Sequence, residues 1–457
     1  MILKRLNDDK RKFEFINPQD KRDKIFGDLT NYIRYIYEFL WKNPYYVAEI
    51  LSNSDINDVK NCLAHFFTIN FYENNLSNNN KEGQLLYIIT LLLKKELNNF
   101  NINDSNNIIN NIEKTFLNNT PCSYIFEQLF YKNDIQAFFK IIILDIIEEL
   151  ERSYPSQEIV FNPSLIRDSI LLEQKERNKA NKSGKEAIIK DENIIIFGKL
   201  NYKKDKNINE KLKLFNQKYQ FGLQREELIK ISKEYENQEM INYINKKILE
   251  CSSNYYLYST SIFLENVNFT TMSDNIGEKY NDEQRKEFSK NILTIYQQSF
   301  FETTKIIDKL INNLISNMHV LPYSIKCINK IIFTIIDKKY PDLPVFEKNV
   351  FIYQFFFNKL FFPILLNPSI YVLINDFIIS DNTIYNLSTI MSIINKFATG
   401  QFYKDTKIEG QYTPLNWYFL NKMPTLLEFF EKSSNVNLPN FIEKILYNEN
   451  EFDFEFD

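Results

Sequence analysis

Few side chains in this sequence have types and spacing that could do chemistry. Cys62 and His65, three residues apart, are candidate zinc ligands, but a structural zinc site needs four ligands and no further cysteine or histidine lies nearby. The other histidine, His319, stands alone. The carboxylate pairs Glu148-Glu149 and Asp191-Glu192 are typical of solvated helix or loop surfaces. The sequence therefore predicts no metal site and no cofactor.

The sequence also lacks the glycine-based catalytic motifs. Its eight glycines are too far apart for a GxGxxG dinucleotide motif, a P-loop or a GxSxG nucleophile turn. The segment NKSGKEA at 181–187 lacks the first glycine of a P-loop. No cysteine belongs to a CxxC pair, so free thiols in a reducing compartment are expected at Cys62, Cys122, Cys251 and Cys327.

Composition excludes two further classes of protein. The chain has 457 residues, of which 59 are acidic and 55 basic, so it lacks the basic excess that usually marks nucleic-acid binding. A membrane-spanning helix needs about 20 apolar residues. The apolar run at 360–375 is shorter and contains two prolines and two asparagines, so no membrane span is expected. The opening MILKRLNDDKRKFEF has no continuous apolar stretch and does not resemble a secretory signal.

The segment FNKLFFPILLNP, at 357–368, is the most unusual apolar stretch. A plain core helix avoids proline, which removes a backbone donor and disfavours helix just before it, yet this segment holds Pro363, Pro368 and the charged Lys359. The simplest interpretation is a buried helix that ends at Pro363. That interpretation leaves Lys359 unexplained.

The elements that must position these residues are helices. Apolar residues recur at spacings of three or four along most of the chain, and we find no 20–50-residue repeat of the kind that marks a solenoid. The sequence therefore predicts an all-α fold. Asn43-Pro44 is expected to separate two helices. Further helices are predicted at 58–71, 83–97, 137–151, 287–318, 324–336, 348–362 and 386–397, with a break around 118–121.

Two polar regions interrupt this pattern. From Glu173 to about Leu249 the chain is rich in Lys, Glu and Asn, which predicts a large, partly mobile insertion that a protease cuts first. Within it, NIIIFGKL could form a strand or a docking segment. The chain ends NENEFDFEFD, where three phenylalanines alternate with three carboxylates; this acidic tail is either disordered or docks as an added strand.

Four segments, in order, resemble the Ras GTPase-activating-protein (Ras-GAP) domain. LWKNPYYVAEIL at 40–51 resembles the opening helices of the branch found at the N-terminus of endocytic Rab exchange factors. TFLNNTPCSYIFEQLF at 115–130 resembles the finger-loop segment, and LPYSIKCINKII at 321–332 a Pro-x-x-Leu-Arg helix start. FNKLFFPILLNP resembles the Phe-Leu-Arg…Pro-Ala-Ile-x-Asn-Pro signature, and STIMSIINKFA at 388–398 fits the helix that follows. The resemblance implies an all-helical domain with a large polar insertion.

The resemblance also implies which residues form the site. The finger-loop position falls on Asn118, Asn119 and Thr120. The residues that would support a GTPase-binding groove are Lys359, Pro363, Asn367, Pro368 and Asn395. In the family the basic residue of the signature braces the finger loop, and the Asn-Pro pair breaks the helix beneath the groove. Here Pro363 and Asn367-Pro368 are expected to make that break.

The sequence departs from the family where catalysis would occur. A catalytic Ras-GAP inserts an arginine beside the transferring phosphoryl group, worth about 10³–10⁵ in rate. Here that position is Asn118, and the bracing arginine is replaced by Lys359, which lacks the planar guanidinium fork. We therefore expect no catalytic residue and no GAP activity. A displaced finger, with Lys114, Arg152 or Arg167 as candidates, or a glutamine-finger-type mechanism, is the active alternative.

Three hypotheses about function follow from these observations. The first is a Ras-GAP-like protein that binds a small GTPase of the Ras or Rab type without stimulating hydrolysis, with partners in a trafficking or scaffold complex. By analogy it would be cytoplasmic and peripheral on endosomes or vesicles. The second is an active GAP, and the third is a helical scaffold with no GTPase partner. The expected divisions are an N-terminal arm at 1–25, a first helical part at 26–170, the insertion at 171–285 and a second helical part with the tail at 286–457.

Overall fold

The structure is a computed structural model. It describes residues 32, 35–36, 38–40, 42–71, 81–100, 112, 116–153, 159–162, 165–170, 194–197, 200–203, 242, 282–367, 379–404 and 409–447. The chain divides into two compact units, residues 1–93 with 439–457 and residues 94–438. The N-terminal arm, most of the insertion and the acidic tail lie outside the described residues. The expected divisions at 26–170, 171–285 and 286–457 therefore stay predictions.

The first unit is helical in its described part. Its elements are α3 (Pro44–Asn53), α4 (Ile56–Asp58), the π-helices η1 (Val59–Leu63) and η2 (Phe66–Phe71), most of α5 (Lys81–Asn99) and α22 (Asn440–Tyr447). Helix α3 begins at Pro44, as predicted, because proline's missing N–H costs nothing in a first turn. Helix α22 approaches α5 closely: a Cβ at Gly83 would lie 3.1 Å from the Phe441 ring. Glycine at this position permits that approach.

The second unit contains the site. Its elements are the last turn of α5, α7 (Pro121–Gln128), the 3₁₀ helix η3 (Leu129–Tyr131), α8 (Asn133–Ser153), the strands β1 (Ile194–Phe197) and β2 (Leu200–Lys203), α15 (Asp282–Ser316), η4 (Met318–Val320), α16 (Tyr323–Lys339), α17 (Val345–Tyr353), the π-helix η5 (Gln354–Phe361), α18 (Phe362–Leu366), α20 (Asp381–Ala398), η6 (Gly410–Tyr412) and α21 (Pro414–Ser434). The predicted all-α fold is confirmed, with one hairpin as the exception among the described residues.

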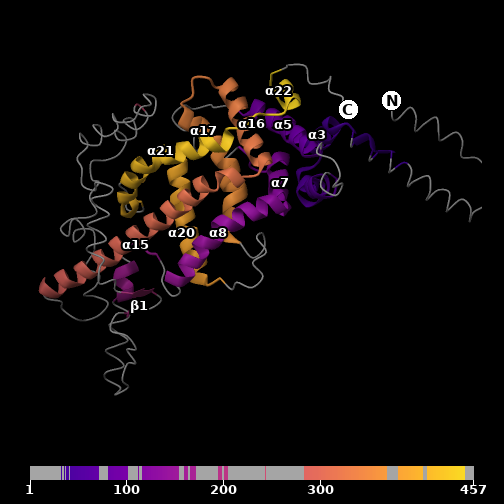
Figure 1. Ribbon diagram of the computed structural model, residues 1–457. Helices are drawn as coiled ribbons and strands as arrows, with labels where there is room; N and C mark the ends of the chain where they lie inside the picture. Colours follow the sequence, from indigo (N-terminus) through magenta and orange to yellow (C-terminus); the bar gives the residue numbers. More distant parts are fainter. Residues whose placement is uncertain are drawn as a thin grey trace, which may run out of the picture. The chain divides into compact units, whose positions relative to one another are not determined.

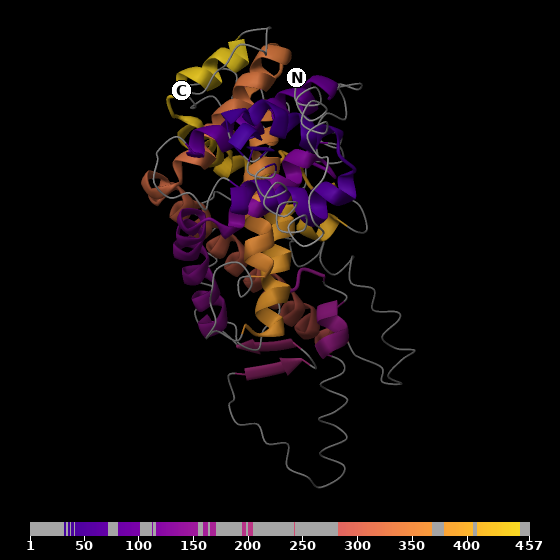
Figure 2. The ribbon, with the colours of Figure 1, turned by 90° about the vertical axis from the view of Figure 1, so that its right-hand side faces the viewer.

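That hairpin lies within the polar insertion. Strands β1 and β2 pair antiparallel, with Ile194 opposite Lys203 and Phe197 opposite Leu200 (Figure 2). Of the segment NIIIFGKL, Ile194–Phe197 form β1, and its last residue, Leu200, begins β2. The rest of the insertion lies outside the described residues, apart from Asn242.

Helices from before and after the insertion pack against each other. Helix α8 contacts α15 (Figure 1), and Lys305 Nζ lies 2.8 Å from a Glu149 carboxylate oxygen. Lys309 binds the other oxygen of Glu149 at 2.5 Å and Asp145 at 3.0 Å. A hydrogen bond from Asn313, followed by the interactions with Lys309, lowers the pKa of Asp145. Burial raises the pKa of Glu149, but the hydrogen bonds and charges of Lys305 and Lys309 outweigh it, so that this pKa is also lowered. Residues far apart in sequence thus form one interface.

Helix α21 packs against α15, α16, α17 and α20 of this unit and also contacts η6. The sequence pattern predicted no helix after 397, so α21 was not expected. Pro424 lies inside α21 and has no backbone N–H to donate to the preceding turn. The helix nevertheless continues through it to Ser434. The apolar side chains of Leu415, Phe419, Met423, Leu426 and Phe430 are buried, and their packing outweighs the lost hydrogen bond.

Helices α17, η5 and α18 form one continuous helix, Val345–Leu366. By length and composition this is the one helix in the described part of the chain that could cross a membrane, but 78% of its most apolar window is buried inside the protein. A buried core helix passes the same test of length and composition, and this helix packs on α7, α16 and α21. The aromatic rings along it account for much of its apolar character.

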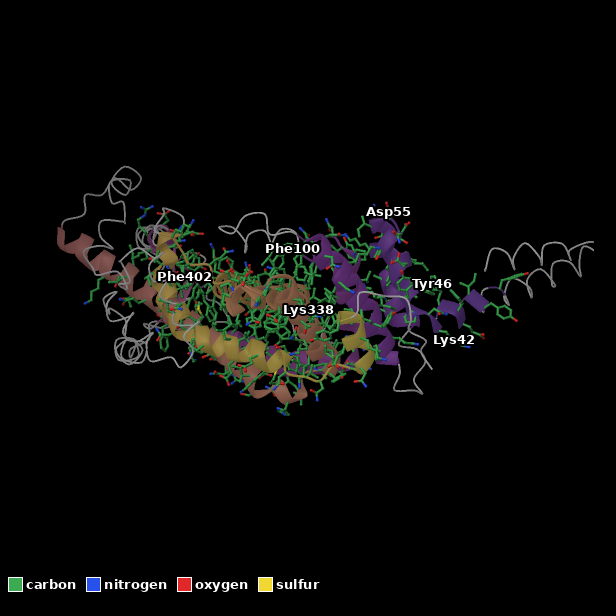
Figure 3. All side chains as sticks on the ribbon, turned by 90° about the horizontal axis from the view of Figure 1, so that it is seen from above. Lys42, Tyr46, Asp55, Phe100, Lys338 and Phe402 are labelled. Carbon is green, nitrogen blue, oxygen red and sulfur yellow. The ribbon has the colours of Figure 1, made fainter. Side chains whose placement is uncertain are left out.

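The end of α5 is tied to α16 by a lysine. Lys339 Nζ donates to the backbone carbonyls of Leu97, at 2.7 Å, and Asn98, at 2.9 Å, and also to that of Phe100. These carbonyls lie at or just beyond the C-terminus of α5, where the last carbonyls of a helix have no donor one turn on. Figure 3 labels Phe100 and the neighbouring Lys338 at this junction. The contact fixes the last turn of α5, which carries one residue of the site.

Candidate functional site

The finger-loop position is a tight turn with two left-handed residues. Leu117 has φ 57° and Asn119 has φ 53°, a region that non-glycine residues rarely adopt. Asparagine tolerates this conformation, but for leucine the strain costs about 1–3 kcal/mol. Leu117 is buried while Asn118 and Asn119 are exposed. The buried leucine side chain anchors the turn, and the two carboxamides are displayed at the surface.

Helix α7 begins directly after this turn with a strong cap. The Thr120 hydroxyl accepts from the Ser123 N–H at 3.2 Å, and the Ser123 hydroxyl accepts from the Thr120 N–H at 3.2 Å. This reciprocal capping box, followed by Pro121 in the first turn, fixes where the helix starts. The Tyr124 hydroxyl donates to Asn119 Oδ1 at 3.0 Å. The turn is therefore held from its helix side.

Glu96, in the last turn of α5, holds the turn from beneath. The Leu117 N–H donates to Glu96 Oε1 at 2.8 Å, and the Thr120 side chain also hydrogen-bonds this carboxyl group. Burial raises the pKa of Glu96 from its ordinary value of 4.5 to about 7, against the lowering effect of both hydrogen bonds and of the Lys359 charge. The carboxyl group is thus ionised only in part near neutral pH.

Lys359 acts on the turn indirectly, through the electrostatic interaction of its charge with the Glu96 carboxyl group. Its pKa is lowered by burial, an effect that the negative charges of Glu127 and Glu96 oppose. In the described part of the chain Lys359 has these two electrostatic partners and no hydrogen bond to a loop carbonyl. The sequence-based expectation placed Lys359 near the finger loop. The structure brings it into the electrostatic range of Glu96, which itself contacts the loop.

The π-helix η5 sets the position of Lys359. Its Phe355 ring packs on Phe126 of α7, with centroids 4.4 Å apart, so η5 lies against the helix that follows the turn. π-Helical segments inside α-helices are frequent at functional sites. Here the segment covers the sequence stretch that holds Lys359.

Asn395 of α20 is tied to the same helix. Its side-chain oxygen accepts from the Tyr353 hydroxyl, which also lies 3.3 Å from Asn358 Oδ1. Asn358 in turn donates to Gln354 Oε1 at 2.6 Å. This polar chain crosses from η5 to α20 inside an apolar environment. Asn395 therefore supports the helix that carries Lys359, and among the described residues no contact places it at the loop.

The helix does not end at Pro363, but its last residue is Leu366, directly before the Asn367-Pro368 pair that was expected to break it. Pro363 is in the first turn of α18, and the helix continues through it to Leu366, so the expected break at 362 was wrong. The π-helical hydrogen bond from Phe362 N–H to the Phe357 carbonyl shows the local widening that precedes this proline. The exposed Asn367 ends the helix, and its N–H donates to the Pro363 carbonyl at 3.1 Å. Pro368 lies outside the described residues.

Two of the three alternative finger residues, Arg152 and Arg167, lie in the described part of the chain. Lys114 lies outside the described residues. The Arg167 side chain is 12% exposed and binds the neighbouring Asp168 at 2.7 Å. Arg152 is 80% exposed and pairs with Glu148 at 3.7 Å. It lies in the last turn of α8, about 28 Å along the helix axis from Asn133 at 1.5 Å per residue. No contact brings either arginine to the turn at 117–120 among the residues that the structure describes.

Sequence reasoning missed Glu96 although a signal was present. Helix 83–97 was predicted from its apolar positions, and Glu96 falls on the same face, three residues after Leu93 and four before Phe100. A carboxylate on an apolar stripe is rarely buried without partners. Those partners, the turn and Lys359, come from distant parts of the chain and were not visible in the helix itself.

The raised pKa of Glu96 predicts a pH-dependent stability. The folded protein binds this proton more tightly than the unfolded chain, so the free energy of unfolding should fall as the pH rises from about 4.5 to about 7. The full change amounts to at most about 3 kcal/mol. Glu96→Gln keeps an acceptor without the charge and should remove this component. Urea denaturation at pH 5 and pH 8 measures it.

The matched control for this prediction is Glu428→Gln. Glu428 is an exposed carboxylate of α21 that pairs with Lys432 one turn away. This control should keep the wild-type pH dependence. A slope in Glu96→Gln as steep as that of the wild type would assign the effect to other groups.

Comparison with known proteins gives one match. The family model described as GTPase-activator protein for Ras-like GTPase matches residues 88–399, more than half of the chain. The match begins within α5 and ends after α20, so it contains Glu96, the turn at 117–120, Lys359 and Asn395. No curated protein matches the chain.

Proposed function

The chain belongs to the Ras-GAP family, and from this premise we propose that it binds a small GTPase without accelerating GTP hydrolysis. Family membership implies a small GTPase as partner. The observation that carries the rest of the proposal is Asn118, an exposed carboxamide at the tip of the turn that resembles the finger loop. Asparagine has no charge to place on a developing phosphoryl transition state.

The retained architecture of the turn supports binding. Strained backbone persists only where the surroundings hold it in place, and it concentrates at functional sites. Here the strain at Leu117 is held by Glu96 below and by the capping box beside it. A surface that had lost every function would be under no need to keep this conformation. The loop is therefore proposed to contact the GTPase, with the charge needed for catalysis absent.

The finer assignment is also a proposal. The segment 40–51, which resembles the branch at the N-terminus of endocytic Rab exchange factors, includes most of α3 (Pro44–Asn53). On this resemblance we propose an adaptor or scaffold role in vesicle traffic, in the cytoplasm and peripheral on endosomes or vesicles. The resemblance of that one segment is its support. Its test is co-localisation of the tagged chain with endosomal markers, and a uniform cytosolic distribution would reject it.

Binding is tested with purified small GTPases of the Ras and Rab types. Each is loaded with GDP or with a non-hydrolysable GTP analogue, and the affinity of the full chain is measured by calorimetry. We expect binding that depends on the nucleotide. Asn118→Asp places a negative charge where the nucleotide phosphates would approach, so it should weaken binding by at least about tenfold.

The matched control is Asn57→Asp, an exposed asparagine outside the region of the family match. It makes the same chemical change and should leave the affinity within about twofold of the wild type. Absence of binding to every GTPase in both nucleotide states would reject the proposal and favour a helical scaffold without a GTPase partner.

A further inference from the structure

We propose that Glu96 is a positioning residue that holds the turn 117–120 and thereby the display of Asn118. The carboxyl group accepts the Leu117 N–H at 2.8 Å and bonds the Thr120 side chain, so it spans the two ends of the turn. Asn118 and Asn119 lie between those two anchor points. Loss of the carboxyl group would release both ends together.

The backbone of the turn needs a hydrogen-bond acceptor to keep its conformation. Leu117 adopts a left-handed conformation with its side chain fully buried, and its N–H donates to Glu96 Oε1. A buried N–H without an acceptor is costly, and Glu96 supplies that acceptor. The strained conformation and the carboxyl group are thus linked. Without the carboxyl group, Leu117 would gain by returning to a conventional backbone conformation.

The Thr120 hydroxyl links Glu96 to the helix cap. Its oxygen accepts from the Ser123 N–H at 3.2 Å, which leaves the hydroxyl proton for the Glu96 carboxyl group. One hydroxyl therefore caps α7 and contacts Glu96 at the same time. The start of α7, the turn and the last turn of α5 form one hydrogen-bonded assembly.

The charged and titratable groups around Glu96 are few. Lys359 faces it from η5, and Glu127 of α7 acts on that same lysine. The Cys122 thiol of α7 also faces Glu96, and its pKa is raised by burial and by the Glu96 charge, so it stays neutral. Lys359 is thus the one positive charge acting on Glu96 in the described part of the chain. Glu96 therefore holds the turn by direct hydrogen bonds, which Lys359, the basic residue of the signature, does not make to the loop carbonyls in the described part of the chain.

Hydrogen–deuterium exchange on the free, full-length protein tests this role. Glu96→Ala should speed exchange in a peptide covering 116–120 by at least about tenfold, because the loss of hydrogen bonds to this carboxyl group frees the turn. A peptide from α16, 323–339, serves as the reference. Glu428→Ala, on the exposed surface of α21, is the matched control and should change neither peptide.

The pH profile separates positioning from a simple packing role. Glu96→Gln imitates the protonated carboxyl group and should protect the turn as the wild type does at pH 6. At pH 8 the wild type carries the buried charge, so its turn should exchange faster than that of Glu96→Gln at the same pH. Equal rates in wild type and Glu96→Ala, or an equal rise in the turn and in α16, would overturn the proposal.

The link to the partner rests on the proposed function and is measured separately. Glu96→Ala should weaken GTPase binding by at least about tenfold, while Glu96→Gln should stay within about threefold of the wild type. If the turn responds as expected but no GTPase binds, the positioning role stands and the proposed function fails. If a GTPase binds and the exchange of the turn is unaffected by Glu96→Ala, the positioning role fails alone.

Discussion

GTP hydrolysis by a Ras-type GTPase should proceed at its intrinsic rate in the presence of saturating amounts of this protein. An arginine finger is worth about 10³–10⁵ in rate, and Asn118 supplies neither its charge nor its reach. Single-turnover hydrolysis of radiolabelled GTP measures this directly. It should be run on a GTPase that has first been shown to bind the chain, so that absence of acceleration is not confused with absence of binding.

The double variant Asn118→Arg with Lys359→Arg should recover part of the missing rate. It restores a guanidinium at the displayed tip and a forked donor near Glu96 and Glu127. The control is Asn119→Arg, which adds the same charge at the adjacent exposed position, where the left-handed backbone directs it elsewhere. Strong acceleration by the wild-type protein would refute the proposal, and Lys114→Ala, Arg152→Ala and Arg167→Ala would then identify a displaced finger.

Phe357→Ala should destabilise the second unit by about 3–5 kcal/mol. The ring is 1% exposed and lies in a cluster where it stacks on Tyr353 at 5.2 Å and meets Phe429 at 5.7 Å. Removing it leaves a cavity that the rings around it cannot fill, because each is already packed on others. Urea denaturation followed by circular dichroism gives the change in the free energy of unfolding.

Phe357→Leu is the matched variant for this prediction. Leucine keeps most of the buried volume and should cost less than about half as much as alanine. The helix also carries Lys359 two residues on, so Phe357→Ala should loosen the site as well as the fold. A loss below about 1 kcal/mol would show that the cluster repacks freely and that the ring is not a core residue in energetic terms.

The helices that the sequence predicted well are those whose apolar residues repeat without interruption. Helix α5 was expected at 83–97 and spans Lys81–Asn99, and α20 was expected at 386–397 and spans Asp381–Ala398. The turn at 118–121 was also expected, because Asn-Asn-Thr-Pro offers turn and cap residues together. Local propensity and the final structure agree in these segments.

Prolines account for the largest errors in the fold. Pro363 lies within a helix that continues past it to Leu366, so the expected helix end at 362 was wrong. Pro424 lies inside α21, a helix that the sequence did not predict. In each case buried neighbours on both sides, such as Ile364 and Met423, give a packing gain that single-chain propensity does not contain. Tertiary contacts decided these elements.

The sequence predicted several residues of the candidate site, but not the hydrogen bonds and electrostatic interactions that connect them. Family resemblance drew attention to Asn118 and Lys359. The Lys359 charge acts on the Glu96 carboxyl group, and Asn118 lies between Leu117 and Thr120, which that carboxyl group contacts. Glu96 itself was missed, because a single Glu in a Lys-rich helix end looks like a solvated residue. Its role depends on a backbone N–H at Leu117, a group that every residue has and that no sequence pattern marks.

The contact between α8 and α15 explains how the chain tolerates so long a segment between them. Glu149 and Asp145 on one helix bind Lys305 and Lys309 on the other, so the interface is made by side chains and not by the intervening peptide. Closing a longer loop between two fixed ends costs only about 0.6 kcal/mol for each doubling of its length. A segment inserted after Ile170, where the buried stretch at 159–170 ends, can therefore be lengthened at small entropic cost. Two separately made fragments, one ending after α8 and one beginning at α15, would still carry complementary halves of one interface.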